Sequence, residues 1–449
     1  MHNLCAVVDK LPAPKPIANV MDVDMEVYKQ MVQPPVRESG HEGIAYVTLP
    51  LSASALSTTE SAQEKAAISL VIAKKAALGH VFADTLRFPL ANTVFQTGSP
   101  TTMIYSIWER GRESNSLTLK TKQHVTHHGI EIDQGISALS VPLVPLSIPR
   151  QVIAGMGNIL RQVVGPDNKP VPASQELEGI VPRYFKARGE PSQATSVWAL
   201  VMNEETLSGV KKKLDLLLEV SPKTGDDASA AGNVQWETLW RRNPPSWSAL
   251  VPEALASGAR LHRVLSGGGG WGKKAGLLSL DPVAVTEDPI SSDDFDSSDG
   301  LSDISSALQQ VVNEGEYIQF FISPSISTPA DIYDENDAIL SNKLDNSLNL
   351  WGWEFGTIPS TLDSLPIRTR QEDAVKSNSI SVFRHSFGAL AEGGIVINRK
   401  LKRNAEDSFR TIRSSTVDVP FSRFSVLNVN KPKKKKEVRG FKRIYVKEV

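Results

Sequence analysis

The chain has 449 residues, enough for two or three domains, and its 40% hydrophobic and 22% charged residues are ordinary for a globular protein with a sizeable core. Lysine plus arginine (49) nearly balances aspartate plus glutamate (50), which excludes a global field that would attract nucleic acid or a membrane. The single cysteine, Cys5, excludes an internal disulfide and a cysteine-based zinc site.

These features are typical of an intracellular, reducing compartment. No apolar run approaches the roughly 20 residues of a spanning helix, so we expect no membrane span. Residues 1–30 contain no arginine and include Asp9, Asp22, Asp24 and Glu26, which fits neither a signal peptide nor a clear mitochondrial presequence. The nucleus and the mitochondrial matrix are both compatible with these properties.

The fold class that we expect is α+β, with helices and sheets mixed in the first half and a β-rich second half. Residues 1–40 contain five prolines and predict an extended arm. Residues 41–286 predict an α+β region, in which a strand over 44–51 precedes a helix. Ser61 and Glu64 fit the capping box of that helix. Its apolar face would comprise Ala67, Leu70, Val71 and Leu78.

A second helix is expected to begin at Pro149, because proline is favoured in the first helical turn. Gly155 and Gly157 interrupt it, each at a cost of about 1 kcal/mol relative to alanine. Its apolar stripe would consist of Val152, Ile153, Met156, Ile159, Leu160 and Val163. Strands are predicted over 86–95, 102–109, 116–125 and 196–202, and further helices near 174–188 and 204–219.

The composition changes sharply after the first half. Residues 287–303 carry seven carboxylates among many serines and no lysine or arginine, so we expect 287–305 to be an acidic disordered loop or linker. Strand-like runs on both sides, at 277–280 and 317–323, slightly favour an inserted loop. Residues 306–430 then predict a β-rich region with strands at 351–355, 380–383, 394–398 and 421–429.

A glycine-rich box is the main candidate site. The stretch Gly267–Lys273 matches the G-x-x-x-x-G-K part of a P-loop, but Lys274 stands where a magnesium-binding Ser or Thr is required. We therefore do not expect a P-loop ATPase or GTPase. The simplest interpretation is a tight glycine turn where two chain segments pass closely. The alternative is an anion nest that binds phosphate through Gly267, Gly268, Gly269, Gly270, Gly272, Lys273 and Lys274.

Other constellations indicate no catalytic residue, no metal site and no cofactor. His124, His127 and His128 are predicted to be surface histidines, because a strand does not direct all three to one point. Cys5 has no histidine near it that would support a nucleophile. Four tryptophans could stack bases or bind a peptide, but core packing is the commoner interpretation. They are Trp236, Trp240, Trp247 and Trp271.

The basic tail, residues 431–449, carries the functional hypothesis. Within 431–447 nine lysines and arginines face one acid, Glu437, and aromatic residues interrupt the charges. This pattern suits phosphate contact, a nuclear import signal or simply a solvated end. The candidate nucleic-acid contacts are Lys433, Lys434, Lys435, Lys436, Arg439, Lys442 and Arg443.

We therefore expect a non-catalytic intracellular protein that joins a ribonucleoprotein or another nucleic-acid-containing assembly through this tail. RNA, a ribonucleoprotein and other proteins are the partners that this hypothesis implies. The alternative is an enzyme or ligand-binding protein that holds a phosphate-bearing small molecule at the 267–274 loop. An enzyme would need an acid, a base or a metal ligand that converges on this loop.

Overall fold

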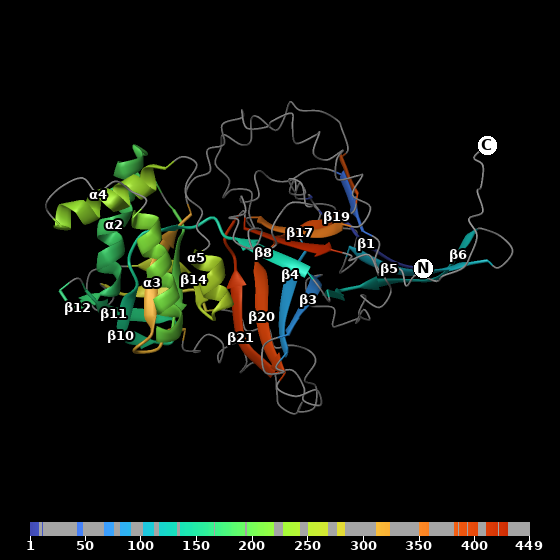
Figure 1. Ribbon diagram of the computed structural model, residues 1–449, viewed down its shortest axis with the longest axis horizontal. Coiled ribbons are helices and arrows are strands. Elements are labelled where there is room, and N and C mark those ends of the chain that lie inside the picture. The colour runs from blue at the N-terminus through green and yellow to red at the C-terminus, as the bar shows by residue number, and fades with distance from the viewer. Residues whose placement is uncertain are drawn as a thin grey trace, which may run out of the picture.

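The described part of the protein consists of a helix-covered β-barrel, a β-sandwich and a small projecting sheet, arranged in a row (Figure 1). A computed structural model describes residues 1–8, 11, 43–47, 67–75, 81–90, 102–111, 116–132, 135–165, 167–193, 195–219, 228–242, 250–267, 276–282, 311–323, 350–358, 381–384, 386–392, 394–402, 410–420 and 422–429.

Six antiparallel strands close the barrel, in the order β10–β11–β15–β14–β13–β16 and back to β10. The closing contact pairs Arg150 with Ile318 and Gln151 with Tyr317. Two short strands, β9 and β12, extend the sheet beside β16 and β11. The strands are β9 (Val144–Pro145), β10 (Arg150–Met156), β11 (Ile159–Val164), β12 (Pro170–Pro172), β13 (Val197–Met202), β14 (Arg260–Gly267), β15 (Leu278–Leu280) and β16 (Tyr317–Ile322).

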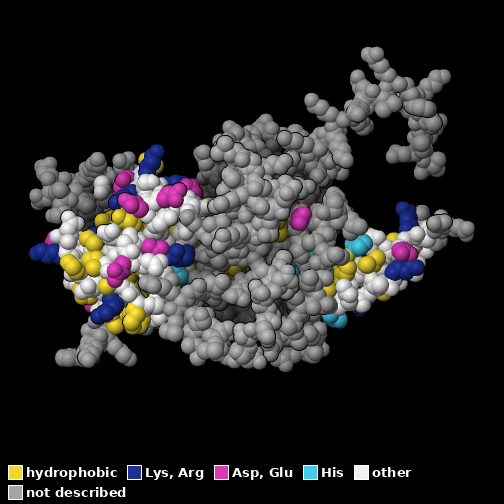
Figure 2. Space-filling model, turned by 90° about the horizontal axis from the view of Figure 1, so that it is seen from below, with side chains coloured by type: hydrophobic (Ala, Val, Ile, Leu, Met, Phe, Trp, Pro, Cys, Tyr) yellow, Lys and Arg dark blue, Asp and Glu magenta, His cyan; other side chains and the backbone are white. Residues whose placement is uncertain are grey.

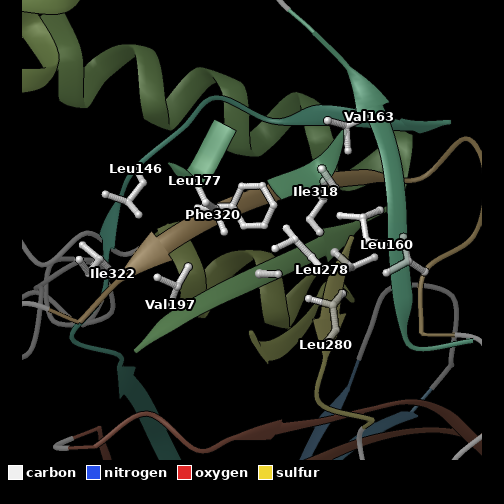
Figure 3. Close-up of a cluster of buried hydrophobic side chains, with 14 of the residues drawn as sticks. Leu146, Leu160, Val163, Leu177, Val197, Leu278, Leu280, Ile318, Phe320 and Ile322 are labelled. Atoms are coloured by element: carbon white, nitrogen blue, oxygen red, sulfur yellow. The ribbon is translucent and has the colours of Figure 1, made fainter. Parts of the chain in front are cut away.

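Four helices within the described residues cover the barrel (Figure 1). They are α2 (Ala173–Arg188), α3 (Glu204–Glu219), α4 (Ala228–Arg241) and α5 (Leu250–Ala256). Apolar side chains, mostly aliphatic, fill the barrel and pack against α2 (Figure 3). Phe320 of β16 and Leu280 of β15 are fully buried there, and Leu177 of α2 closes this layer.

Two facing sheets form the sandwich, and its strands come from both sides of the barrel in the sequence. Phe88 of β4 stacks on Phe355 of β17 across the core, with ring centroids 4.0 Å apart and planes 12° apart. One sheet has the order β18–β2–β19–β17–β22–β8 and the other β21–β20–β4–β3–β7. The strands are β2 (Gly43–Tyr46), β3 (Ala67–Lys75), β4 (Val81–Pro89), β7 (His127–Ile132), β8 (Gly135–Ser140), β17 (Leu350–Ile358), β18 (Ser381–Arg384), β19 (Ser386–Glu392), β20 (Ile395–Lys402), β21 (Arg410–Val417) and β22 (Arg423–Val429).

The barrel and the sandwich share an apolar interface. Val417 and Val419, at the end of β21, pack with Leu200 and Leu261 of the barrel. The Leu261 backbone N–H also donates to Ser415 Oγ at 3.2 Å. The projecting sheet lies at the opposite side of the sandwich (Figure 1). It has the order β1–β5–β6 and consists of β1 (His2–Ala6), β5 (Met103–Arg110) and β6 (Leu117–Val125).

The expected α+β class is wrong, because sheets dominate the molecule. Of the described residues, 52% lie in strands and 23% in helices. The predicted helices near 174–188 and 204–219 are confirmed as α2 and α3. Two further predicted helices are strands instead, one in the sandwich and the other, a hairpin, in the barrel.

The helix predicted after Ser61 is wrong for residues 67–75, the part of it that the structure describes. Residues 67–75 form β3, and Ile68, Leu70 and Ile72 point into the sandwich core. A short apolar run satisfies the helical and the strand period at once, and here β-branched residues and long-range pairing with β4 decide for the strand. The capping residues Ser61 and Glu64 lie outside the described residues.

The helix predicted after Pro149 is also wrong, because this segment is the β10–β11 hairpin. Met156 pairs with Ile159, so Gly157 and Asn158 form a two-residue turn. Gly157 has a positive φ of 58°, which hairpin turns matched to strand twist favour. The glycine that would weaken a helix therefore positions the turn of a hairpin.

Both sides of the acidic segment belong to the barrel. Strand β15 ends at Leu280 and β16 begins at Tyr317, and both lie in the same closed sheet. The segment 287–305 itself lies outside the described residues. The barrel therefore extends across the composition boundary at 287–305, and the sandwich takes strands from before and after the barrel.

Candidate functional site

The glycine-rich box lies in the connection between two antiparallel strands of the barrel. Gly267 is the last residue of β14 and pairs with Leu278 of β15. The remaining candidate residues lie outside the described residues; they are Gly268, Gly269, Gly270, Gly272, Lys273 and Lys274. A P-loop leads from a strand into a helix, whereas this connection leads into an antiparallel strand. The topology therefore gives no support to the P-loop interpretation.

Gly276, where the chain leaves the box, is held against the start of α2. Its φ is +84°, and a Cβ placed on it would lie 2.7 Å from Pro172 Cβ. Its carbonyl oxygen accepts a hydrogen bond from the Ser174 N–H at 3.3 Å. Because Pro172 provides no side-chain cap, this carbonyl satisfies one of the unpaired N–H groups at the helix start. Two chain segments thus pass closely at this glycine.

A pocket of about 290 Å³ opens beside the same connection. It lies between α2 and the strands β13, β14 and β15, and its floor is apolar. Leu177, Val197 and Leu278 contribute both to this pocket and to the barrel core (Figure 3). Its volume is close to the lower limit for small-molecule sites. The lining residues are Ser174, Leu177, Glu178, Val181, Thr195, Val197, Val264 and Leu278.

Acidic side chains on α2 determine which ligand would suit this pocket. Ser174 Oγ donates to Glu178 Oε1 at 2.9 Å, and Glu178 lines the pocket. Glu176, one turn away from the helix start, pairs with Arg150 at 3.0 Å, and burial raises the pKa of its carboxyl. The carboxylate of Glu178 opposes a bound anion, so the described part of the pocket suits a neutral or cationic group better than phosphate.

Polar side chains cluster at one end of the barrel interior, which the sequence hypothesis did not identify. Arg260 Nη2 donates to both carboxylate oxygens of Glu316 at 2.9 Å. Next to this pair on β14, His262 is buried and its Nδ1–H donates to the Asp281 carbonyl oxygen at 3.0 Å. Burial lowers the pKa of His262 to about 4, so the ring is neutral at pH 7.

A sequence signal for this cluster was present. Arg260 and His262 alternate with Leu261 and lie on the same side of β14 as Val264, which packs against the barrel core. Charged or polar residues at core-facing positions of a strand are uncommon and mark either a buried pair or a site. His262 Nε2 has no hydrogen-bond partner within the described part of the chain.

Charged residues also meet where the barrel contacts the sandwich. Asp281 follows β15, Asp418 follows β21, and Arg263 of β14 acts electrostatically on both. Burial raises the pKa of both carboxyls, and the proximity of Asp281 raises that of Asp418 further. Arg263 Nη2 donates to Ser196 Oγ at 3.1 Å. These charged side chains therefore lie within electrostatic range of one another at the boundary between the two regions.

The three neighbouring histidines do not share one environment. His124 is exposed on β6, and His127 is half-buried with its Nε2 2.8 Å from Ser69 Oγ. His128 is buried against Tyr105, and burial lowers its pKa to about 4. The prediction of three surface histidines is therefore wrong for His128, because β7 enters the sandwich core. Across the described ranges, no three His, Cys, Asp or Glu side chains are grouped as metal ligands would be.

The two tryptophans of helix α4 have mainly a packing role. Trp240 is buried in the barrel core, and its Nε1–H donates to the Pro145 carbonyl oxygen at 3.1 Å. Trp236 packs against the same core, with its ring centroid 5.8 Å from that of Trp240. The core interpretation is confirmed for these two. Trp247 and Trp271 lie outside the described residues.

The basic tail, with Lys433, Lys434, Lys435, Lys436, Arg439, Lys442 and Arg443, also lies outside the described residues. Within the described part, no helix combines the length and the apolar character needed to cross a bilayer. Comparison with known proteins adds no assignment. No family model matches the chain, and no curated protein or solved structure is significantly similar to it.

Proposed function

We propose that this protein is a non-catalytic component of a nucleic-acid-containing assembly, which it contacts through its basic tail. The observation that carries the proposal is the charge of residues 431–447, where nine lysines and arginines accompany Glu437 alone. Phosphate groups of RNA or DNA are the partner that such a run neutralises, with release of condensed counterions. Contacts of this kind favour affinity over sequence choice.

The fold supports this proposal by the place where the tail begins. Strand β22 ends at Val429 and is paired on both sides, with β17 and β8. The tail therefore starts at a fixed point of the sandwich. No strand or helix of the described structure extends beyond Val429, so removal of residues 431–449 leaves the described pairing intact.

Truncation after residue 430 tests the proposal. We expect the truncated protein to unfold at an unchanged temperature and to bind single-stranded RNA at least tenfold more weakly near about 100 mM salt. The intact protein should lose affinity as salt rises, with a log–log slope of about −3 or steeper. A matched control is the Lys211, Lys212 and Lys213 run of α3, whose replacement by glutamine should leave RNA binding unchanged. Equal binding by intact and truncated protein contradicts the proposal.

A second candidate function is a small-molecule site at the 267–274 loop, where Lys273 and Lys274 would be the phosphate contacts. The neighbouring pocket would take a neutral or cationic part of such a ligand, because Glu178 in its lining opposes an anion. Replacement of both lysines by alanine should then weaken binding of a nucleotide or inorganic phosphate, measured by calorimetry. Unchanged thermal stability on addition of millimolar phosphate or nucleotide would count against this function.

A further inference from the structure

One side of α2 forms a wall of the pocket beside the glycine-rich connection. The α2 residues that line the pocket follow the spacing i, i+3, i+4 and i+7, which places them on the same side of a helix. Leu177 among them is buried in the barrel core, and Val181 packs against that core. The wall therefore combines an apolar surface that the core holds in place with one carboxylate. Its residues are Ser174, Leu177, Glu178 and Val181.

Three barrel strands supply the opposite wall. Val197 of β13, Val264 of β14 and Leu278 of β15 contribute aliphatic side chains, and Thr195 beside β13 contributes a hydroxyl. Leu278 is 1% exposed and so lies at the floor, whereas Thr195 and Val264 are half-buried. The described lining includes no lysine, arginine or histidine. Its polar groups are thus acceptors or hydroxyls, and its floor is apolar.

The carboxylate of Glu178 is held in position from the glycine-rich connection. The Ser174 N–H donates to the Gly276 carbonyl oxygen at 3.3 Å, and Ser174 Oγ donates to Glu178 Oε1 at 2.9 Å. Ser174 is 2% exposed, so this contact is shielded from water, while Glu178 itself is exposed. Among the described residues, Ser174 is the one hydrogen-bond partner of the Glu178 side chain. Oε2 is therefore able to accept a hydrogen bond from a ligand.

No single sign of charge surrounds the pocket at long range. Figure 2 shows acidic and basic side chains interspersed on the visible surface of the barrel and its helices. Recognition of a charge in the pocket therefore depends on Glu178 itself. A carboxylate attracts a cation and opposes an anion, and the apolar walls favour burial of hydrocarbon.

We propose that this pocket binds a small organic amine with a short apolar body. The protonated nitrogen donates to Glu178 Oε2 and to the Thr195 hydroxyl, and the hydrocarbon lies against Val181, Val264 and Leu278. The volume of about 290 Å³ suits a body no larger than one ring with a short chain. The inference depends neither on RNA binding by the tail nor on phosphate contacts by Lys273 and Lys274.

Three probes that share one ring and differ in charge test the inference. They are phenethylamine, phenethyl alcohol and hydrocinnamate, each titrated into the full chain by calorimetry. We expect phenethylamine to bind with a Kd on the order of 1 mM, as befits a ligand of this size. Phenethyl alcohol should bind about fivefold more weakly, because the contact with a solvent-accessible carboxylate is lost. Hydrocinnamate should show no saturable binding, because its charge opposes that of Glu178.

Two variants locate the site. Glu178→Gln keeps an acceptor for Ser174 and removes the charge, so phenethylamine should bind about fivefold more weakly while the alcohol binds as before. Val181→Phe fills the pocket and should abolish saturable binding of both probes. Glu205→Gln, at an exposed position of α3, is the matched control and should bind like the wild type. Circular dichroism and thermal unfolding verify that each variant is folded.

The outcomes separate this site from the tail and from the loop. Phenethylamine binding that survives both truncation after residue 430 and replacement of Lys273 and Lys274 by alanine supports the inference, whatever becomes of the other two proposals. Equal affinity of the wild type for the amine and the alcohol overturns it. So does a Glu178→Gln variant that still prefers the amine, or a Val181→Phe variant that binds it as the wild type does.

Discussion

The barrel is built from one continuous stretch of the sequence, whereas the sandwich combines two segments that flank this stretch. The six barrel strands come from one stretch, residues 150–322, and include the β10–β11 hairpin with its two-residue turn. The sandwich combines residues 43–140 with residues 350–429, so its two halves meet only after the barrel segment has been synthesised. The closing β10–β16 pair joins the two ends of the barrel stretch, whereas the sandwich depends on pairing between the segments that precede and follow that stretch.

Their interiors differ as well. The barrel holds an ion pair, Arg260–Glu316, and the neutral His262 at one end of its apolar core. At the centre of the sandwich core, the ring of Phe88 packs against those of Phe355 and Phe424. The two regions thus differ in what lies at the centre or the end of the core, a buried ion pair in one and three phenylalanine rings in the other.

The largest effect is expected from removal of an aromatic ring in either core. Phe355→Ala should cost about 3–5 kcal/mol, because a fully buried ring that stacks on Phe88 is lost and a cavity remains. Phe320→Ala is the matched change in the barrel. Hydrogen exchange should show the greatest loss of protection in β17 and β22 for the first variant, and in β13 and β16 for the second.

The pattern of lost hydrogen-exchange protection shows whether the barrel and the sandwich unfold separately. If each variant reduces protection equally in both regions, the barrel and the sandwich unfold as one cooperative unit. In that case the shared interface of Leu200, Leu261, Val417 and Val419 couples them more strongly than their separate cores imply.

A smaller effect is expected where each region needs a glycine at a close approach. Gly394 has a φ of +90°, and an added Cβ would lie 2.9 Å from the Val417 carbonyl oxygen. Gly276 has a φ of +84° and would contact Pro172 at 2.7 Å. Alanine at either position should cost about 2–3 kcal/mol, measured by denaturant unfolding, because backbone strain and overpacking add.

Gly189 is the control that separates these two causes. Its φ is +68°, but an added Cβ would meet nothing within 4 Å. Gly189→Ala should therefore cost only the conformational strain, about 1 kcal/mol. If Gly276→Ala costs no more than Gly189→Ala, the contact with Pro172 is easily relieved and the start of α2 is not held tightly.

A pH-dependent effect compares one buried histidine from each region. Burial lowers the pKa of His262 in the barrel and of His128 in the sandwich to about 4. Between pH 6.5 and 4 the unfolded chain binds a proton that the folded chain does not, so stability falls as the pH falls. Each histidine contributes a slope of up to about 1.4 kcal/mol per pH unit.

Urea unfolding between pH 7 and pH 4.5 measures this slope. His262→Gln and His128→Gln should each remove part of the loss of stability at low pH. Asp281, Asp418 and Glu176 have raised pKa values and act with the opposite sign, so the difference between variant and wild type is the informative quantity. A pH dependence that neither variant changes would show that both rings are protonated at little cost.

Local patterns in the sequence determined several elements. Alternation over 116–125 predicted β6, an apolar run over 196–202 predicted β13, and helices predicted near 174–188 and 204–219 are α2 and α3. Gly267, the first residue of the glycine box, ends β14. These features depend on residues within one element, so their period is visible in the sequence.

Tertiary contacts selected the remaining strands. Residues 67–75 and 150–164 have apolar spacings that suit a helix or a strand, and pairing with β4 or across the Gly157 turn selects the strand. The close approach of Gly276 to Pro172 likewise depends on a neighbour distant in sequence. The physical reason is that burial and register are properties of paired elements, whereas composition and periodicity are properties of single ones.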